Sequence, residues 1–277
     1  MKSKPNVRSR GEGPPVVLLH SSGSSGRQWD TLVNGIEGRF RLHAIDLHGH
    51  GGTPAWLGDH VLRLDDDAAL VEPLLQAPGG VHLVGHSYGA ALALKLAALY
   101  PDRVRSVVAF EPVLFRLLAD FNPRDNAARE VVAAAASIRH WLELGHVERS
   151  AQRFVDFWSG DGSWTALPAN HQQVITARMP SIVAHFRALF ADPMKRGTLS
   201  KLNMPVLCLT GEKTRPTTRR LGELLRYRMP QATHATLTGM GHMGPVTHPI
   251  QVASRIAGFL DAQEMLAAES ESLLEAA

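Results

Sequence analysis

A serine lies between two glycines in the pentapeptide Gly85–Gly89, after an apolar run and before a helix-like run. Gly-x-Ser-x-Gly between a strand and a helix is the pattern of a nucleophile elbow, a sharp turn that raises a serine hydroxyl above the edge of a sheet. Both glycines are needed because a side chain at either position would collide with the neighbouring helix or strand. Ser87 is therefore the candidate nucleophile.

A serine hydroxyl is a weak nucleophile at neutral pH, so it needs a base that takes its proton. Gly239–His242 supplies a histidine in a Gly-x-Gly-His setting, just before the last helix-like segment. His242 can accept the proton of Ser87 and later donate it to a leaving group. The two motifs together predict a hydrolase-type enzyme.

Short apolar runs and helix-like segments alternate along most of the chain, and these are the elements that must position Ser87 and His242. Short apolar runs of this kind are typical of strands buried on both faces, and their alternation with helices predicts a parallel sheet covered on both sides. We expect strands at 16–20, 42–46, 81–85, 104–110, 206–209 and 235–237, helices at 65–76, 90–100, 217–229 and 249–263, and a frayed helical tail at 264–277.

The alternation stops between residues 113 and 201, where helix-like patterns such as 127–144 and 147–157 follow one another. We interpret 113–201 as a helical cap inserted into a core made of residues 1–112 and 202–277. An excess of aromatic side chains suits an apolar lid over a pocket, although a core internal to the lid would give the same pattern. The insertion holds nine of the 17 aromatic residues: Phe115, Phe121, Trp141, Phe154, Phe157, Trp158, Trp164, Phe186 and Phe190.

Composition narrows the class of protein. The 277 residues are 44% hydrophobic and 20% charged, which is ordinary for a globular chain. With 29 basic and 26 acidic residues and no basic run interleaved with aromatics, nucleic acid is not an expected partner. The lone Cys208 cannot form an intramolecular disulfide, and no signal-peptide-like or membrane-spanning stretch is visible. We expect a soluble, cytoplasmic protein that acts on a small molecule away from membranes.

The chain resembles the α/β-hydrolase superfamily over nearly its whole length, through four motifs in order. Leu18–Gly23 is similar to the family's loop after the first strong strand, with Ser21 where most relatives carry glycine and Trp29 matching a later tryptophan. Asp46–Thr53 is similar to the family's Asp-x-x-Gly-x-Gly-x-Ser loop. The elbow at Ser87 and the histidine at His242 complete the set. The resemblance implies an α/β-hydrolase fold, with a mostly parallel central sheet flanked by helices. The stretch before Val16 is short for the family's first strand pair, so we expect a truncated or reorganised sheet edge.

The resemblance also implies an oxyanion hole made by the backbone N–H groups of Ser22 and Tyr88. For the acid of a triad, relatives usually place an aspartate where this chain has Thr214, which cannot compensate an imidazolium. A minority of the superfamily, including some haloalkane dehalogenases, carries the acid after the preceding strand, where Glu111 stands here. A glutamate that closes an apolar strand should be costly unless it is paired. We favour Glu111 over Glu212, with a Ser–His dyad or an inactive site as further alternatives.

Other histidines allow a metal hypothesis, since His48 and His50 are two positions apart and His20 and His43 are near them in sequence. His48 and His50 occupy variable positions of the loop that resembles the family's, and no Cys or carboxylate cluster supplies a closed ligand set, so we expect neither metal nor cofactor. We interpret His86 as a packing or hydrogen-bonding residue. A basic cluster around 211–220 is interpreted as a solvated helix N-terminal region rather than an anion site: Lys213, Arg215, Arg219 and Arg220.

The predicted activity is cleavage of a carboxylic ester with a small or medium apolar acyl group, through an acyl-enzyme. Ser87 would attack, His242 would relay the proton, and Glu111 would hold His242. A C–C bond hydrolase, a lactonase or a cofactor-free perhydrolase would use the same triad. The alternative from another class is a non-catalytic small-molecule-binding protein on the same fold, and Thr214 at the usual acid position is the feature that favours it.

Overall fold

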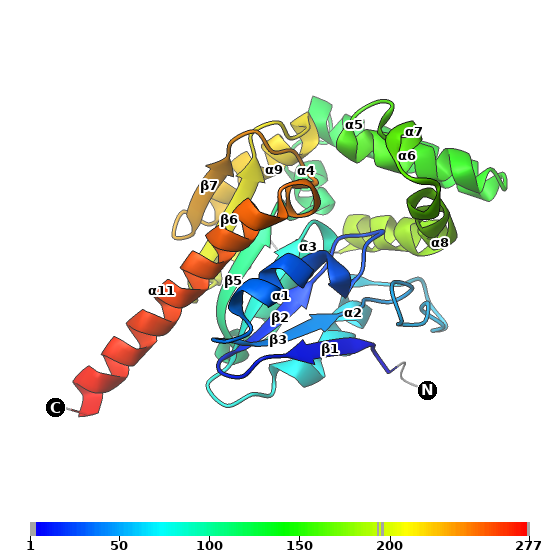
Figure 1. Ribbon diagram of the computed structural model, residues 1–277. Coiled ribbons are helices and arrows are strands. Elements are labelled where there is room, and N and C mark those ends of the chain that lie inside the picture. Colours follow the sequence, from blue (N-terminus) through cyan, green and yellow to red (C-terminus); the bar gives the residue numbers. More distant parts are fainter. Residues whose placement is uncertain (1–3, 193, 195–196, 276–277) are drawn as a thin grey trace.

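The computed structural model describes residues 4–192, 194 and 197–275. A sheet of seven strands runs through the centre in the order β1-β3-β2-β4-β5-β6-β7 (Figure 1). Neighbouring strands are parallel except for β1, which pairs antiparallel with β3 at one edge. The strands are β1 (Val7–Arg10), β2 (Pro15–Leu19), β3 (Arg41–Ile45), β4 (Val81–His86), β5 (Val104–Phe110), β6 (Val206–Gly211) and β7 (Thr233–Leu237).

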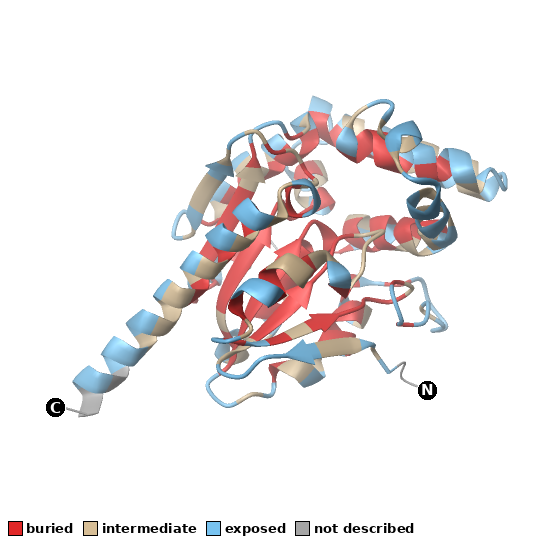
Figure 2. Ribbon diagram, viewed as in Figure 1, coloured by how far each residue is buried: buried red, intermediate tan, exposed pale blue. Residues whose placement is uncertain are grey.

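Two layers of helices cover the sheet because successive strand residues point to opposite faces. In β2, Val16 and Leu18 join the core under helices α1 (Asp30–Ile36) and α11 (Pro249–Glu275). Val17 and Leu19 join the larger core on the other face. Helices α2 (Leu64–Val71), α3 (Tyr88–Leu99) and α9 (Pro216–Arg228) contribute to that larger core. Figure 2 shows the central strands as almost continuously buried, whereas the edge strands β1 and β7 are partly exposed.

Between β5 and β6 the described residues form five α-helices, grouped at one end of the molecule (Figure 1). Helix α5 packs on α6, α6 packs on α8, and α8 in turn reaches α2 and α3 of the main body. Their apolar side chains continue the larger core and do not form a separate one. The helices are α4 (Phe115–Phe121), α5 (Asn126–Glu143), α6 (Val147–Ser159), α7 (Ser163–Ala166) and α8 (Ala169–Ala191).

The expected α/β architecture with a mostly parallel, helix-flanked sheet is confirmed. The strand β1 was not expected, and it supplies the reorganised edge as a single antiparallel strand. The expected helical extension at the tail is present, because α11 is one helix to Glu275. Glu264 holds the first part of this extension against the sheet, because its Oε1 lies 2.9 Å from both His82 Nε2 and Arg105 Nη2. No helix in the described part of the chain has the length and apolar character needed to cross a bilayer.

Candidate active site

The elbow is formed where β4 turns directly into α3. Ser87 has φ 56° and ψ −113°, and its N–H donates to Phe110 O at 2.9 Å, which fixes the turn to the neighbouring strand. A Cβ at Gly85 would overlap the carbonyl of Gly89, and a Cβ at Gly89 would overlap the carbonyl of Leu19. The two glycines are thus required by close backbone approach, as the sequence pattern predicted.

Ser87, His242 and Glu111 form one chain of hydrogen bonds. The Ser87 hydroxyl is 3.0 Å from His242 Nε2, and His242 Nδ1 donates to Glu111 Oε2 at 2.7 Å. Exposed fractions are 5% for Ser87, 2% for His242 and 1% for Glu111, so water does not compete for these bonds from most directions. Within the described residues, Ser87 and Glu111 are also the non-glycine positions with positive φ, 56° and 46°. Backbone strain of this kind gathers at functional sites.

The Glu111 carboxylate is held on both oxygens. Oε1 accepts the N–H of Gly211 at 2.7 Å, and Oε2 accepts the hydroxyl of Thr214 at 2.9 Å in addition to His242. Thr214 therefore orients this carboxylate from the position where relatives usually carry the acid itself. Glu212 lies elsewhere: it is exposed, and its carboxylate accepts the N–H of Gly239 at 2.8 Å.

The imidazole of His242 is enclosed by two other rings. Trp158 of α6 stacks on it with a centroid separation of 3.9 Å and an interplanar angle of 24°. His86 Nε2 donates to the carbonyl of His242 at 2.8 Å, so the His86 proton is on Nε2, and Nδ1 has no hydrogen-bond partner among the described residues. Burial, followed by the nearby His242, holds the pKa of His86 well below its ordinary value. His86 is therefore a neutral ring whose proton is donated to a backbone carbonyl, as expected of a hydrogen-bonding and packing residue.

The loop after β2 is held by side chains on several sides. The Ser21 hydroxyl donates to Gln28 Oε1 at 2.8 Å, and the N–H of Gly23 donates to His50 Nε2 at 3.0 Å. Tyr88 is the first residue of α3, so its N–H has no partner within the helix. The Ser22 hydroxyl is 2.9 Å from Nδ1 of His185, which comes from α8.

His20 and His50 connect this loop to the loop after β3. His20 Nε2 accepts the N–H of Leu47 at 3.0 Å, so its Nδ1–H donates to Ser21 O at 2.8 Å. By the same reasoning His50 donates from Nδ1 to His48 O at 2.9 Å. Burial lowers the pKa of His50 to about 3, with a further contribution from His20. The described residues contain no group of three or more His, Cys, Asp or Glu side chains placed to hold a metal ion.

A second buried network lies behind Tyr88. Its hydroxyl donates to Asp67 Oδ2 at 2.6 Å, and the other oxygen of Asp67 is 2.7 Å from His48 Nδ1. The ring of Tyr88 stacks on His185 at 3.7 Å between centroids. Burial, followed by the Asp67 charge, holds the pKa of Tyr88 well above its ordinary value, and burial holds that of His185 well below. Neither Asp67 nor His185 belongs to a motif, so sequence reasoning missed both.

A cavity of about 570 Å³ opens above Ser87 and His242. One side is formed by the loop after β2, and the other by apolar side chains of the segment between β5 and β6. Four of the nine aromatic residues counted in that segment line the cavity: Phe115, Phe154, Trp158 and Phe186.

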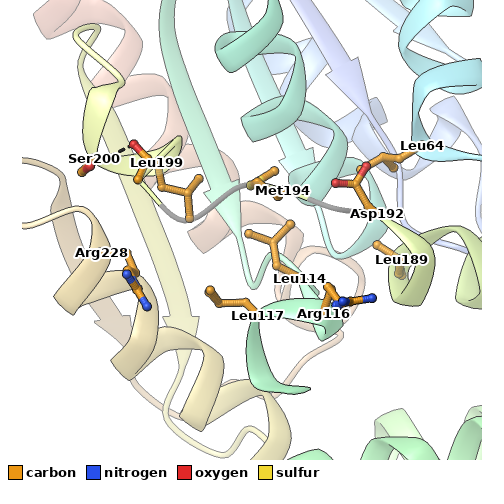
Figure 3. A pocket seen from close by; sticks show the side chains of 11 residues that line it. Leu64, Leu114, Arg116, Leu117, Leu189, Asp192, Met194, Leu199, Ser200 and Arg228 are labelled. Carbon is orange, nitrogen blue, oxygen red and sulfur yellow. Dashed lines mark hydrogen bonds between the residues drawn. The ribbon is translucent and has the colours of Figure 1, made fainter. Parts of the chain in front are cut away.

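A separate hollow between α4, α8 and the end of α9 has a volume of about 30 Å³. Figure 3 shows Leu114, Leu189 and Asp192 around it. A space of this size holds about one water molecule, so it is not a substrate site.

The remaining residues singled out in the sequence lie apart from the cavity. Arg215 pairs with Glu130 of α5, and Arg220 pairs with Asp125, each at 3.1 Å. Burial raises the pKa of the Cys208 thiol to about 12. The two arginines link α9 and its preceding loop to the segment that contains α5, and Cys208 is a buried core residue.

The fold and the buried serine–histidine pair define a hydrolase, and the chain belongs to the alpha/beta hydrolase family, whose model matches residues 16–255. It is 28% identical over 244 residues to a pimeloyl-[acyl-carrier protein] methyl ester esterase of Chromobacterium violaceum, covering 83% of this chain and 90% of the relative.

Solved structures with the same fold include an esterase from Thermogutta terrifontis, with a TM-score of 0.74, 20% identity and 94% coverage of both chains. The enol-lactonase from Burkholderia xenovorans also has a TM-score of 0.74, at 19% identity, covering 94% of this chain and 97% of the other.

Proposed function

We propose that this protein is a serine hydrolase that cleaves carboxylic esters through an acyl-enzyme. The observation that carries the proposal is the hydrogen-bonded chain from Ser87 through His242 to Glu111 at the floor of the cavity. The similarity to a methyl ester esterase along most of the chain supports the same activity. The largely apolar lining of the cavity suits a small or medium acyl group.

In the proposed mechanism, Ser87 Oγ attacks the ester carbonyl while His242 Nε2 takes its proton. The backbone N–H groups of Ser22 and Tyr88 receive the oxyanion of the tetrahedral intermediate. His242 then donates the proton to the departing alcohol, and Glu111 stabilises the imidazolium between the two steps. Water repeats the sequence to release the acid and restore Ser87.

The segment 113–201 is proposed to act as a cap over this site. Helices α4, α6 and α8 supply much of the apolar lining of the cavity, and Trp158 of α6 lies against the proposed base. A lactone is a cyclic ester and would be opened by the same steps, so lactonase activity belongs to the same proposal. The protein is expected in the cytoplasm, and its single cysteine is consistent with a reducing compartment.

The test is peptide mass spectrometry after incubation with a fluorophosphonate probe, which reports an activated serine without the natural substrate. We expect one adduct on Ser87 in the wild type, and none in Ser87→Ala or His242→Ala. Ser24→Ala is the matched control because Ser24 lines the same cavity, and it should label normally. A folded wild-type protein that takes no label would contradict the proposal and favour a non-catalytic binding protein.

A further inference from the structure

The cavity above Ser87 is positively charged. The residues that line it include two cations, Arg27 and Arg178, whereas none of the described residues that line it carries a carboxylate. Arg27 is exposed at the rim, and Arg178 is half-buried within the wall. One cation at the rim and a second in the wall, with no carboxylate beside them, favour a substrate that carries negative charge.

Arg178 is held in place while most of its donors stay free. Its Nη1 donates to the carbonyls of Gly23 and Ser24, both at 2.8 Å, which accounts for the two hydrogens on that nitrogen. A guanidinium has five N–H donors, so three remain on Nη2 and Nε without a partner in the described part of the chain. Two neutral carbonyls orient the group but do not neutralise its charge.

No carboxylate in the described chain forms an ion pair with Arg178. Asp46 is the acid whose charge acts on it, but the oxygens of Asp46 already accept from Asn6, Gly26 and Gly52 at 2.7–2.8 Å. Burial lowers the pKa of Arg178 from its ordinary value, which is the signature of a cation that has lost water without gaining a full counter-charge. An anionic ligand group would supply the missing charge.

The distance between Arg178 and the proposed oxyanion hole determines how far the anionic group of such a ligand lies from its ester carbonyl. Gly23 and Ser24 directly follow Ser22, and consecutive Cα atoms are about 3.8 Å apart. The guanidinium therefore lies within roughly 10 Å of the Ser22 N–H. That separation suits an ester whose second functional group is a few carbons from the scissile carbonyl.

We propose that Arg178 is a specificity-determining residue that binds a carboxylate on the substrate, with Arg27 attracting the anion at the rim. The substrate class is then the half-esters of short dicarboxylic acids and related esters with one free carboxylate. Planar guanidinium groups bind carboxylates through paired hydrogen bonds, which a neutral methyl group cannot replace. This inference rests on the proposed ester hydrolysis.

The test compares kcat/KM for the monomethyl esters of succinic, glutaric and adipic acid with that for neutral methyl alkanoates of the same chain length. We expect the wild type to prefer the half-esters, and Arg178→Met to lose ten-fold or more on them while changing about three-fold or less on the neutral esters. Arg178→Lys should recover part of the preference because it keeps the charge. Arg187→Gln is the matched control, since Arg187 lies on the same helix but pairs with Glu143 at the surface.

Labelling of Ser87 by the fluorophosphonate probe separates the two proposals. Normal labelling of Arg178→Met shows that the nucleophile is intact, so that any loss on half-esters belongs to substrate binding. Equal losses on charged and neutral esters would mean that Arg178 only supports the loop at Gly23 and Ser24, and would overturn the inference. A wild type without preference for half-esters would overturn it as well. Failure of the wild type to label would instead contradict the hydrolase.

Discussion

The carboxylate of Glu111 is buried among three donors, the imidazole of His242, the hydroxyl of Thr214 and the N–H of Gly211. A buried charge is tolerated only when it is paired and hydrogen-bonded, and each oxygen here meets that condition. Thr214 is the informative partner. Its hydroxyl donates to the carboxylate that we propose as the triad acid, so a threonine at this position is compatible with a complete triad.

Replacing Glu111 by Gln should lower kcat on an ester substrate by on the order of 10³- to 10⁴-fold while the protein remains folded. The amide keeps the shape of the side chain but cannot stabilise the imidazolium, and it can favour the wrong tautomer of His242. The measurement is steady-state hydrolysis of a p-nitrophenyl ester, with circular dichroism to verify folding.

Glu212→Gln is the control for this experiment, because Glu212 is exposed and bonds only to the N–H of Gly239 among described contacts. The kcat of the Glu212→Gln variant should stay within about three-fold of the wild-type value, as is usual for a surface substitution. An unchanged rate in Glu111→Gln, or a large loss in Glu212→Gln, would remove Glu111 from the role of triad acid.

At the scale of elements, the elbow depends on how closely α3 approaches the strands beside it. The backbone at Gly89 lies against the carbonyl of Leu19 at the end of β2, and Gly85 lies against the first turn of α3. This contact brings the start of α3 beside the loop after β2. The two proposed oxyanion donors, on Ser22 and Tyr88, come from these two segments.

Gly89→Ala should therefore lower the free energy of unfolding by about 2 kcal/mol or more, because the added methyl must displace backbone and not a flexible side chain. Urea unfolding followed by circular dichroism measures the change. Gly258→Ala is the matched control: it lies in α11 with no heavy atom within 4 Å of the added Cβ, and should stabilise the protein by about 0.5–1 kcal/mol. Equal effects of the two substitutions would contradict the close approach.

At the scale of the whole molecule, several histidines are sealed inside the protein. Burial is the largest cause of the lowered pKa of each, and the pKa of His50 falls to about 3. In the unfolded chain a histidine titrates near pH 6.5. The unfolded state therefore binds more protons than the folded state once the pH drops below this value. The histidines in question are His20, His50, His86 and His185.

This difference predicts that the contribution of these histidines to the free energy of unfolding is constant above about pH 7 and falls from pH 6.5 toward pH 5. Each histidine that stays neutral in the fold adds a slope of up to about 1.4 kcal/mol per pH unit. Urea titrations at pH 7.5, 6.5 and 5.5 and constant ionic strength test it. His185→Phe should flatten the slope, because phenylalanine takes up no proton. Stability that does not change between pH 7.5 and 5.5 in the wild type would contradict the prediction.

The order of elements could be read from the chain because each strand carries its own apolar run and each turn its own glycines. Gly85 and Gly89 are local requirements of one sharp turn, so the elbow is visible in five residues. Glu111 was also a local signal, as a carboxylate that ends an apolar strand. Strand β1 gives no such local signal because it is short, half-exposed and lacks an apolar run.

Tertiary structure alone decided how these local signals meet. His242 is 155 positions from Ser87 and 131 positions from Glu111, and no local pattern encodes a contact over such separations. The same holds for Trp158, Arg178 and His185. Their helices carry no motif, and these side chains reach the site only because α6 and α8 pack across the end of the sheet. By itself, the sequence determined the fold class and the candidate chemistry, since both follow from local spacing. The charge and shape of the cavity depend on residues that only packing brings together.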